Sequence, residues 1–218
     1  MGNRQSVELF FCSACPWSYL AFVRLNEAAL RTGANVRYRP VMAEPLYWDG
    51  ASLHAEVGHA DAIVTARIHY ATKNLADWAR FAGVSIKRTS SLPGEMEFAQ
   101  RAIVAAIDAG RGRTFVEALF AAYFGVGHDI SERSVVLRIA ADCGLTGVDF
   151  EQRADSATAA AAIETNTHEL LARGGFAAPT MFVGSDMYVG NDRVPLVESA
   201  LMRAADRPFI APGEHDRL

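Results

Sequence analysis

The chain has 218 residues, half of them apolar, which is enough to bury the core of one large domain or of one domain with an inserted subdomain. Its formal net charge of -4 argues against nucleic-acid binding, which needs clustered positive charge, so we expect a small-molecule partner. The beginning of the chain lacks the long apolar run of a signal peptide or membrane span, and we therefore expect a cytoplasmic protein.

The first predicted elements surround two cysteines. The apolar and β-branched residues 6–12 predict a strand, and residues 16–33 then show helical periodicity between Pro16 and Gly33. Residues 34–42 predict a second strand. Two strands joined by a helix in this way are expected to be parallel, with a right-handed crossover between them.

The long middle of the chain contains no strand-like segment. Amphipathic or alanine-rich stretches separated by glycine predict five helices, at residues 61–83, 95–110, 113–127, 131–144 and 156–175. Residues 179–190 then predict two short strands around a Gly-Ser-Asp turn, and residues 192–205 predict a final helix.

The two ends together form a β-α-β unit and a β-β-α unit with helices between them. This order predicts an α/β protein with a thioredoxin-like fold and a large all-helical insertion. We expect residues 1–45 and 173–218 to form the thioredoxin-like domain, and residues 46–172 to form the helical insertion domain.

Three cysteines, Cys12, Cys15 and Cys143, are too few for a disulfide framework in a chain of this size. A structural zinc site needs four ligands, and one C-x-x-C pair with six scattered histidines does not supply that pattern, so we expect no metal site. The pair itself is compatible with a redox dithiol or with one catalytic thiol beside a bystander.

The two paired cysteines differ in their predicted surroundings. Cys15 directly precedes the helix, where unpaired backbone N–H groups and the positive end of the helix dipole stabilise a thiolate, so we expect its pKa to be lowered. Cys12 ends the strand, where no dipole favours ionisation. In a dithiol oxidoreductase the resolving cysteine lies three residues after the attacking one, and here that position is Ser18. A disulfide between Cys12 and Cys15 remains open.

Two segments resemble a known family. Residues 9–22, L-F-F-C-S-A-C-P-W-S-Y-L-A-F, are similar to the opening of the 2-hydroxychromene-2-carboxylate isomerases and kappa-class glutathione transferases, the glutathione-using branch of the DsbA-like proteins. Residues 174–201, which include A-A-P-T-M-F-V-G and V-G-N-D-R, resemble the second signature of that family almost position for position. The residues between these two segments agree with the family pattern more loosely. Together the three parts extend the resemblance over nearly the whole chain.

The resemblance implies a glutathione site. Pro179 would be the family's cis-proline, and the backbone of Ala178 would pair with the cysteinyl part of glutathione like an added strand. Asn191 and Asp192 match the pair that holds the γ-glutamyl group, although Asp192 is also suited to cap the last helix. Arg67 falls where the family has a lysine or arginine near the glycyl carboxylate, and an exposed helical arginine is the alternative.

The resemblance also implies an activity. In the family, the glutathione thiolate adds to a conjugated double bond, the adduct rotates, and elimination returns the isomer with glutathione unchanged. Cys15 stands where the family has the serine that hydrogen-bonds this thiolate. A thiol is a weaker donor and can itself ionise, so two functions remain open: a glutathione-dependent isomerase or transferase, and a DsbA-like thiol-disulfide oxidoreductase working through Cys15.

The expected partners follow from the same resemblance. We expect glutathione as cofactor and a small aromatic catabolite as substrate, with Trp17, Tyr47 and Trp48 as flat surfaces of the substrate pocket, although each is equally suited to core packing. We also expect a homodimer, and neither a nucleic acid nor a membrane as partner.

Overall fold

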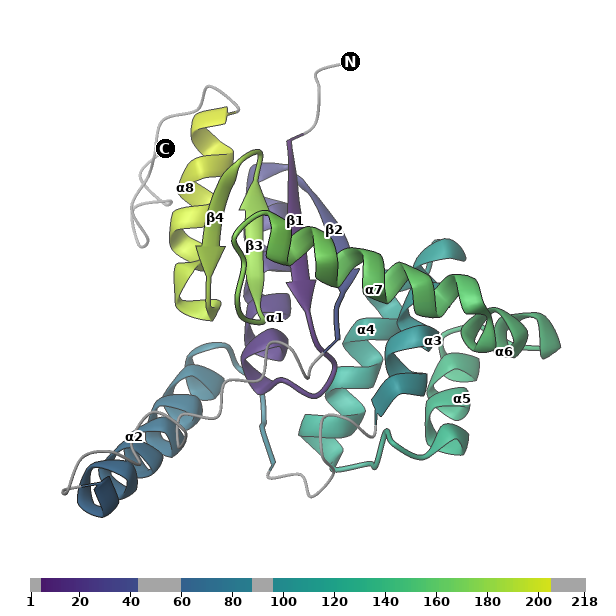
Figure 1. The fold of residues 1–218 in the computed structure, drawn as a ribbon, viewed down its shortest axis with the longest axis horizontal. Helices are drawn as coiled ribbons and strands as arrows, with labels where there is room; N and C mark the ends of the chain where they lie inside the picture. The colour runs from purple at the N-terminus through teal and green to yellow at the C-terminus, as the bar shows by residue number, and fades with distance from the viewer. Residues whose placement is uncertain (1–4, 43–59, 88–95, 205–218) are drawn as a thin grey trace.

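A computed structural model gives the chain a small mixed sheet beside a block of helices (Figure 1). The structure describes residues 5–42, 60–87 and 96–204. The sheet has the spatial order β2-β1-β3-β4, with β1 and β2 parallel and the β1–β3 and β3–β4 pairs antiparallel. The strands are β1 (Ser6–Phe11), β2 (Asn35–Pro40), β3 (Thr180–Val183) and β4 (Asp186–Val189).

Helices pack on both faces of this sheet. Because side chains alternate along a strand, one set from β1 and β3 faces α1 (Pro16–Thr32) and α8 (Val194–Ala204), in a core that contains Val7, Leu9, Phe11 and Met181. The opposite set faces α7 (Ala157–Ala172), where Phe10 and Phe182 pack with Leu170.

The elements described between β2 and β3 are all helical. They are α2 (Ala60–Phe81), α3 (Glu97–Asp108), α4 (Gly112–Phe120), the π-helical turn η3 (Ala121–Val126), α5 (Arg133–Asp142), α6 (Val148–Asp155) and α7. The thioredoxin-like fold with a helical insertion is therefore confirmed. The domain boundaries stay a prediction, and the one between residues 45 and 46 lies outside the described residues.

Two details of the helical block differ from the sequence prediction. The helix α6 was not expected, because its eight residues are mostly polar and too short for a clear apolar period. The stretch predicted as one helix over 113–127 changes to a π-helical turn after Phe120.

Stacked aromatic rings hold the start of α1 against the helical block. The ring of Tyr19 lies 5.2 Å from that of Phe120 and 5.7 Å from that of Phe124, measured between centroids, and both pairs are stacked. All three side chains are buried, and such pairs contribute about 0.5–1.5 kcal/mol beyond the burial of their area. This packing fixes the first turn of α1, which directly follows the turn that contains the paired cysteines.

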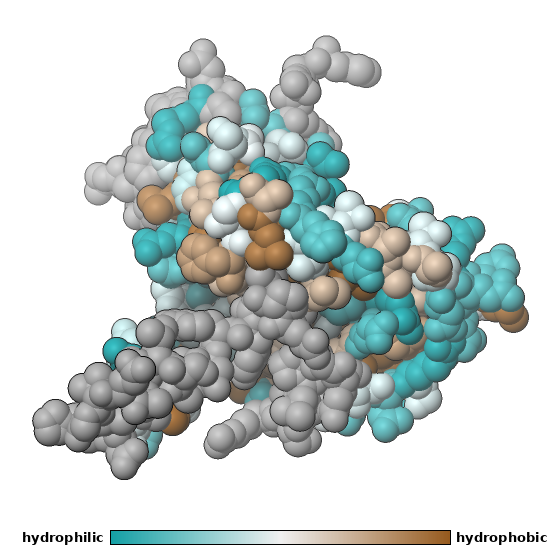
Figure 2. All heavy atoms as spheres, viewed as in Figure 1, coloured by the Kyte–Doolittle hydropathy of each residue, from teal (hydrophilic) through white to brown (hydrophobic). Residues whose placement is uncertain are grey.

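The outer surface of the helical block is largely hydrophilic around α5 and α6 (Figure 2). None of the helices in the described ranges combines the length and apolar character that a bilayer span requires.

Candidate active site

Cys15 occupies the turn that joins β1 to α1. It is the N-cap residue of α1, with Pro16 in the first turn, as the sequence predicted. Its backbone N–H donates to the carbonyl of Cys12 at 3.2 Å, and the N–H of Cys12 donates to the hydroxyl of Ser18 at 3.3 Å. These bonds close the turn and place the thiol of Cys15 at the start of the helix.

The helical insertion also holds this turn in place. Gln100 of α3 accepts a hydrogen bond from the backbone N–H of Ser13 at 3.0 Å and donates to the carbonyl of Val41 at 2.7 Å. Both ends of this buried amide are therefore used to join the cysteine turn to the end of β2. The sequence carried no signal for this role.

The thiol of Cys15 faces the segment that precedes β3. Its Sγ donates to the carbonyl oxygen of Ala178 at a distance of 3.5 Å. The peptide bond between Ala178 and Pro179 is cis, as the resemblance implied. The carbonyl of Pro179 in turn accepts from the N–H of Gly190 at 2.9 Å, which ties this segment to the end of β4.

Burial raises the pKa of the Cys15 thiol above its ordinary value, and donors from Ser18 and Trp17 oppose this change. The lowered pKa predicted from the helix start is therefore wrong, because the loss of hydration outweighs the N–H groups at the helix start. Burial likewise raises the pKa of Cys12 to about 12, and charge on Cys15 would raise it further. Both cysteines are free, and burial favours the neutral thiol of each.

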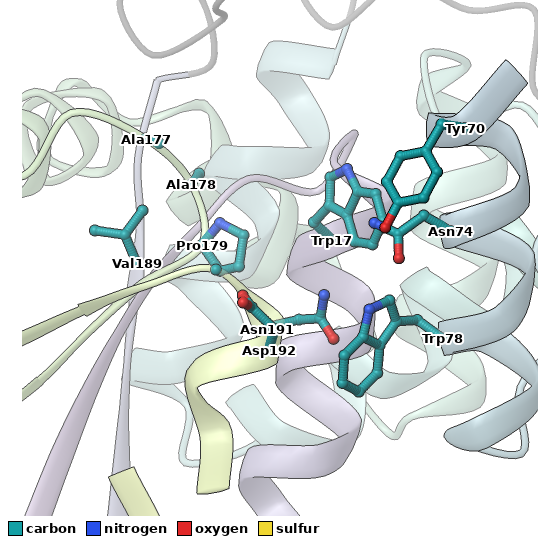
Figure 3. Close-up of a pocket in the computed structure, with 11 residues that line it drawn as sticks. Trp17, Tyr70, Asn74, Trp78, Ala177, Ala178, Pro179, Val189, Asn191 and Asp192 are labelled. Carbon is teal, nitrogen blue, oxygen red and sulfur yellow. The ribbon is translucent and has the colours of Figure 1, made fainter. Parts of the chain in front are cut away.

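A pocket of about 530 Å³ lies beside this thiol. Its walls come from the first turn of α1, from α2, from the segment around the cis-proline, and from the turn between β4 and η4 (Asn191–Arg193) (Figure 3). Tyr70, Asn74 and Trp78 project from α2 toward Trp17 across this pocket (Figure 3). One helix thus supplies an aromatic wall opposite the cis-proline segment.

The structure brings most of the predicted site residues together. Five of them line the pocket, namely Trp17, Ala178, Pro179, Asn191 and Asp192, and Cys15 adjoins it through its bond to Ala178. Arg67 is exposed on α2 and does not line the pocket, but its spacing from Tyr70 and Asn74 places it on the same face of the helix. Tyr47 and Trp48 lie outside the described residues.

Asp192 presents its carboxylate to the pocket rather than capping a helix. Its side chain is 47% exposed and lies 3.6 Å from Arg193. Among the described residues, no backbone N–H donates to this carboxylate. A Cβ atom at Gly190, where φ is +100°, would lie 2.6 Å from Oδ1 of Asp192, so the glycine leaves room for the carboxylate.

Sequence reasoning missed the three pocket residues on α2. Their spacing of four places Tyr70, Asn74 and Trp78 on one helix face, and that pattern was available in the sequence. It also missed Arg24, a buried arginine of α1 that donates to Asn191. An arginine in a helix is usually exposed, so nothing in the local sequence indicated this contact.

Within the described ranges, no group of His, Cys, Asp or Glu side chains is arranged to hold a metal ion.

Comparison with known proteins agrees with this geometry. The model of the DSBA-like thioredoxin domain family matches residues 6–202. The chain belongs to the DSBA-like thioredoxin family. Among curated relatives of this DSBA-like chain, a 2-hydroxychromene-2-carboxylate isomerase of Pseudomonas putida is 26% identical over 203 residues, which cover 90% of this chain and 94% of that protein.

Solved structures show the same fold. A 2-hydroxychromene-2-carboxylate isomerase structure superposes with a TM-score of 0.72 at 24% identity, over 92% of this chain and 96% of that one. A probable DsbA oxidoreductase from Streptomyces coelicolor gives a TM-score of 0.73 at 20% identity, over 95% and 93% of the two chains. The resemblance seen in the two terminal segments is therefore confirmed, and the relatives' names support an enzyme.

Proposed function

We propose that this protein is a glutathione-dependent isomerase or transferase of the 2-hydroxychromene-2-carboxylate isomerase type. The observation that carries the proposal is the position of the Cys15 thiol, which donates to the carbonyl of Ala178 at the wall of the pocket. A protonated thiol can donate a hydrogen bond to a glutathione thiolate, whereas an ionised cysteine would repel it. The raised pKa thus favours the role of a donor over that of a nucleophile.

The described residues fit glutathione. The backbone N–H of Ala178 has no hydrogen-bond partner among them, which leaves it available to a peptide carbonyl. The carboxylate of Asp192 is suited to an α-ammonium group. The side-chain oxygen of Asn191 already accepts from Arg24 at 3.0 Å, so its NH₂ group is the end available to an α-carboxylate.

When bound, glutathione supplies a thiol nucleophile that can add reversibly to a conjugated double bond. Cys15 would donate its S–H to that sulfur in place of the carbonyl of Ala178. Ser18 keeps the Cys15 turn closed, because its hydroxyl accepts from the backbone N–H of Cys12. Trp17, Tyr70 and Trp78 offer ring faces on which a flat substrate can stack.

Thiol-disulfide exchange through Cys15 is the second candidate. It is favoured by the presence of two free thiols in one turn, where the N–H of Cys15 donates to the carbonyl of Cys12. In that reaction the Cys15 thiolate would attack a disulfide, form a mixed disulfide and release one thiol. Ser18 cannot resolve this product, so glutathione or Cys12 would complete the exchange. The raised pKa values of both cysteines disfavour it.

Turnover of 2-hydroxychromene-2-carboxylate, followed by absorbance with and without reduced glutathione, tests the proposal. We expect isomerisation by the wild-type protein only when glutathione is present, and most of that activity in Cys12→Ala. Glutathione-independent turnover would contradict the proposal. Reduction of a disulfide substrate that disappears in Cys12→Ala would establish the second candidate instead.

A further inference from the structure

Arg24 contacts two residues that line the pocket, Asn191 and Trp78. Its side chain is buried in α1, and its Nη1 donates to the carbonyl oxygen of Asn191 at 2.5 Å and to Oδ1 of the same residue at 3.0 Å. The Cζ atom also lies 4.4 Å from the ring centroid of Trp78 and 5.3 Å from that of Phe81. One guanidinium group therefore contacts both η4 and α2.

The contact with Asn191 fixes the orientation of an amide that lines the pocket. The residue Asn191 is 3% exposed, and its side-chain oxygen accepts from the charged guanidinium of Arg24. A flipped amide would place its NH₂ group against the guanidinium and lose this bond. The amide lies between Pro179 and Trp78 in Figure 3, so its NH₂ group is the end left for a ligand.

The contact with Trp78 fixes the aromatic wall. A guanidinium over an indole face is a favourable cation–π arrangement, and burial strengthens it. Trp78 lies on the same helix as Tyr70 and Asn74. The contact between Arg24 and Trp78 therefore fixes the distance between this helix and Trp17 across the pocket.

We propose that Arg24 is a positioning residue that organises the two halves of the pocket together, by holding the Asn191 amide on one side and the Trp78 ring on the other. Its effect on catalysis rests on the proposed glutathione-dependent function, whereas its effect on the two side chains does not. Loss of this arginine should therefore disturb the empty pocket as well as turnover.

The first experiment needs no glutathione. With Trp17 and Trp48 replaced by phenylalanine, Trp78 becomes the only tryptophan, and its near-UV circular dichroism and emission report its surroundings. We expect Arg24→Met to change both signals and Arg24→Lys to change them less. The matched control Arg31→Met removes an exposed arginine that lies two turns further along α1 and pairs with Glu198, and it should leave them unchanged.

The second experiment uses the proteins with all tryptophans present. We expect Arg24→Met to raise the KM for glutathione about tenfold, which corresponds to about 1.4 kcal/mol, with a smaller change in kcat and partial recovery in Arg24→Lys. A folded Arg24→Met protein with the wild-type Trp78 signals and the wild-type KM would overturn the positioning role. If Arg24→Met does not fold, Arg24→Gln gives the same readouts.

The two experiments separate two failures. If the wild-type protein does not use glutathione, the proposed function fails, and the Trp78 signals still decide whether Arg24 positions the ring. If glutathione is used and both Arg24 readouts are unchanged, the positioning role fails alone.

Discussion

The carboxylate of Asp192 is the charged group that lines the described part of the pocket, and its removal gives a measurable change in glutathione binding. Replacement by asparagine removes the charge and nearly preserves the shape. Because the side chain is 47% exposed, water screens its attraction for an ammonium group, and we assign the pair about 1 kcal/mol, at the upper end for exposed pairs. This corresponds to a dissociation constant about fivefold higher in Asp192→Asn.

Thermal unfolding with and without reduced glutathione measures this difference. At a concentration one hundred times the wild-type dissociation constant, binding stabilises the wild-type protein by about 2.7 kcal/mol, and a fivefold weaker constant reduces this to about 1.8 kcal/mol. For a chain of this size, the glutathione-induced rise in Tm should be about 2–4 °C smaller in Asp192→Asn. Asp186→Asn, at an exposed carboxylate of β4 outside the pocket lining, should keep the wild-type rise. An equal rise in Asp192→Asn, or none in the wild-type protein at millimolar glutathione, would refute the glutathione assignment.

Three further predictions concern the turn residues and the cysteines. Gly190→Ala should lower the free energy of unfolding, measured by urea titration, by about 1–3 kcal/mol, because φ is +100° there and the new Cβ would contact Asp192. The control Gly33→Ala, where the new Cβ has open space, should lower the free energy of unfolding by less. Iodoacetamide should label Cys15 slowly at pH 7 and quickly only above pH 9, since burial raises its pKa; peptide mapping that shows fast labelling at pH 7 would contradict this. Burial raises the pKa of Cys12 from 9.0 to about 12, so the folded state keeps this thiol protonated at pH values where the unfolded state ionises it. The contribution of Cys12 to the free energy of unfolding is therefore complete below pH 9, and up to about 4 kcal/mol of it is lost as the pH rises toward 12. Stability should therefore fall less steeply from pH 9 to 12 in Cys12→Ala, and equal slopes would show that Cys12 is hydrated.

The fold was predictable because its signals are local. Strand β1 alternates between two buried faces, α1 begins at Pro16 and ends before Gly33, and the long helical run contains no β-like segment. The exception, α6, is too short and polar to produce an amphipathic period.

Residues of the site were predictable only where they lie in the segments that resemble the family. Ala178 and Asn191 were identified because their segment matches a family signature, and the structure places both beside the pocket. The burial of Arg24 and the raised pKa of Cys15 depend on which elements pack over them. The ring that packs on Arg24 belongs to α2, and Cys15 is desolvated by elements that are distant in the sequence. The burial of Arg24 and the raised pKa of Cys15 therefore have no signal in the local sequence.

The most direct test of the account is the rate of glutathione-dependent isomerisation of 2-hydroxychromene-2-carboxylate in Cys15→Ser and Cys15→Ala. If Cys15 acts as a hydrogen-bond donor to a thiolate, Cys15→Ser should retain or exceed the wild-type rate, because a hydroxyl is the better donor. Cys15→Ala should lose about tenfold to hundredfold, the range for one hydrogen bond to a charged group. Loss of activity in Cys15→Ser equal to that in Cys15→Ala, together with a glutathione mixed disulfide on wild-type Cys15 during turnover, would contradict the account and assign a nucleophilic thiol.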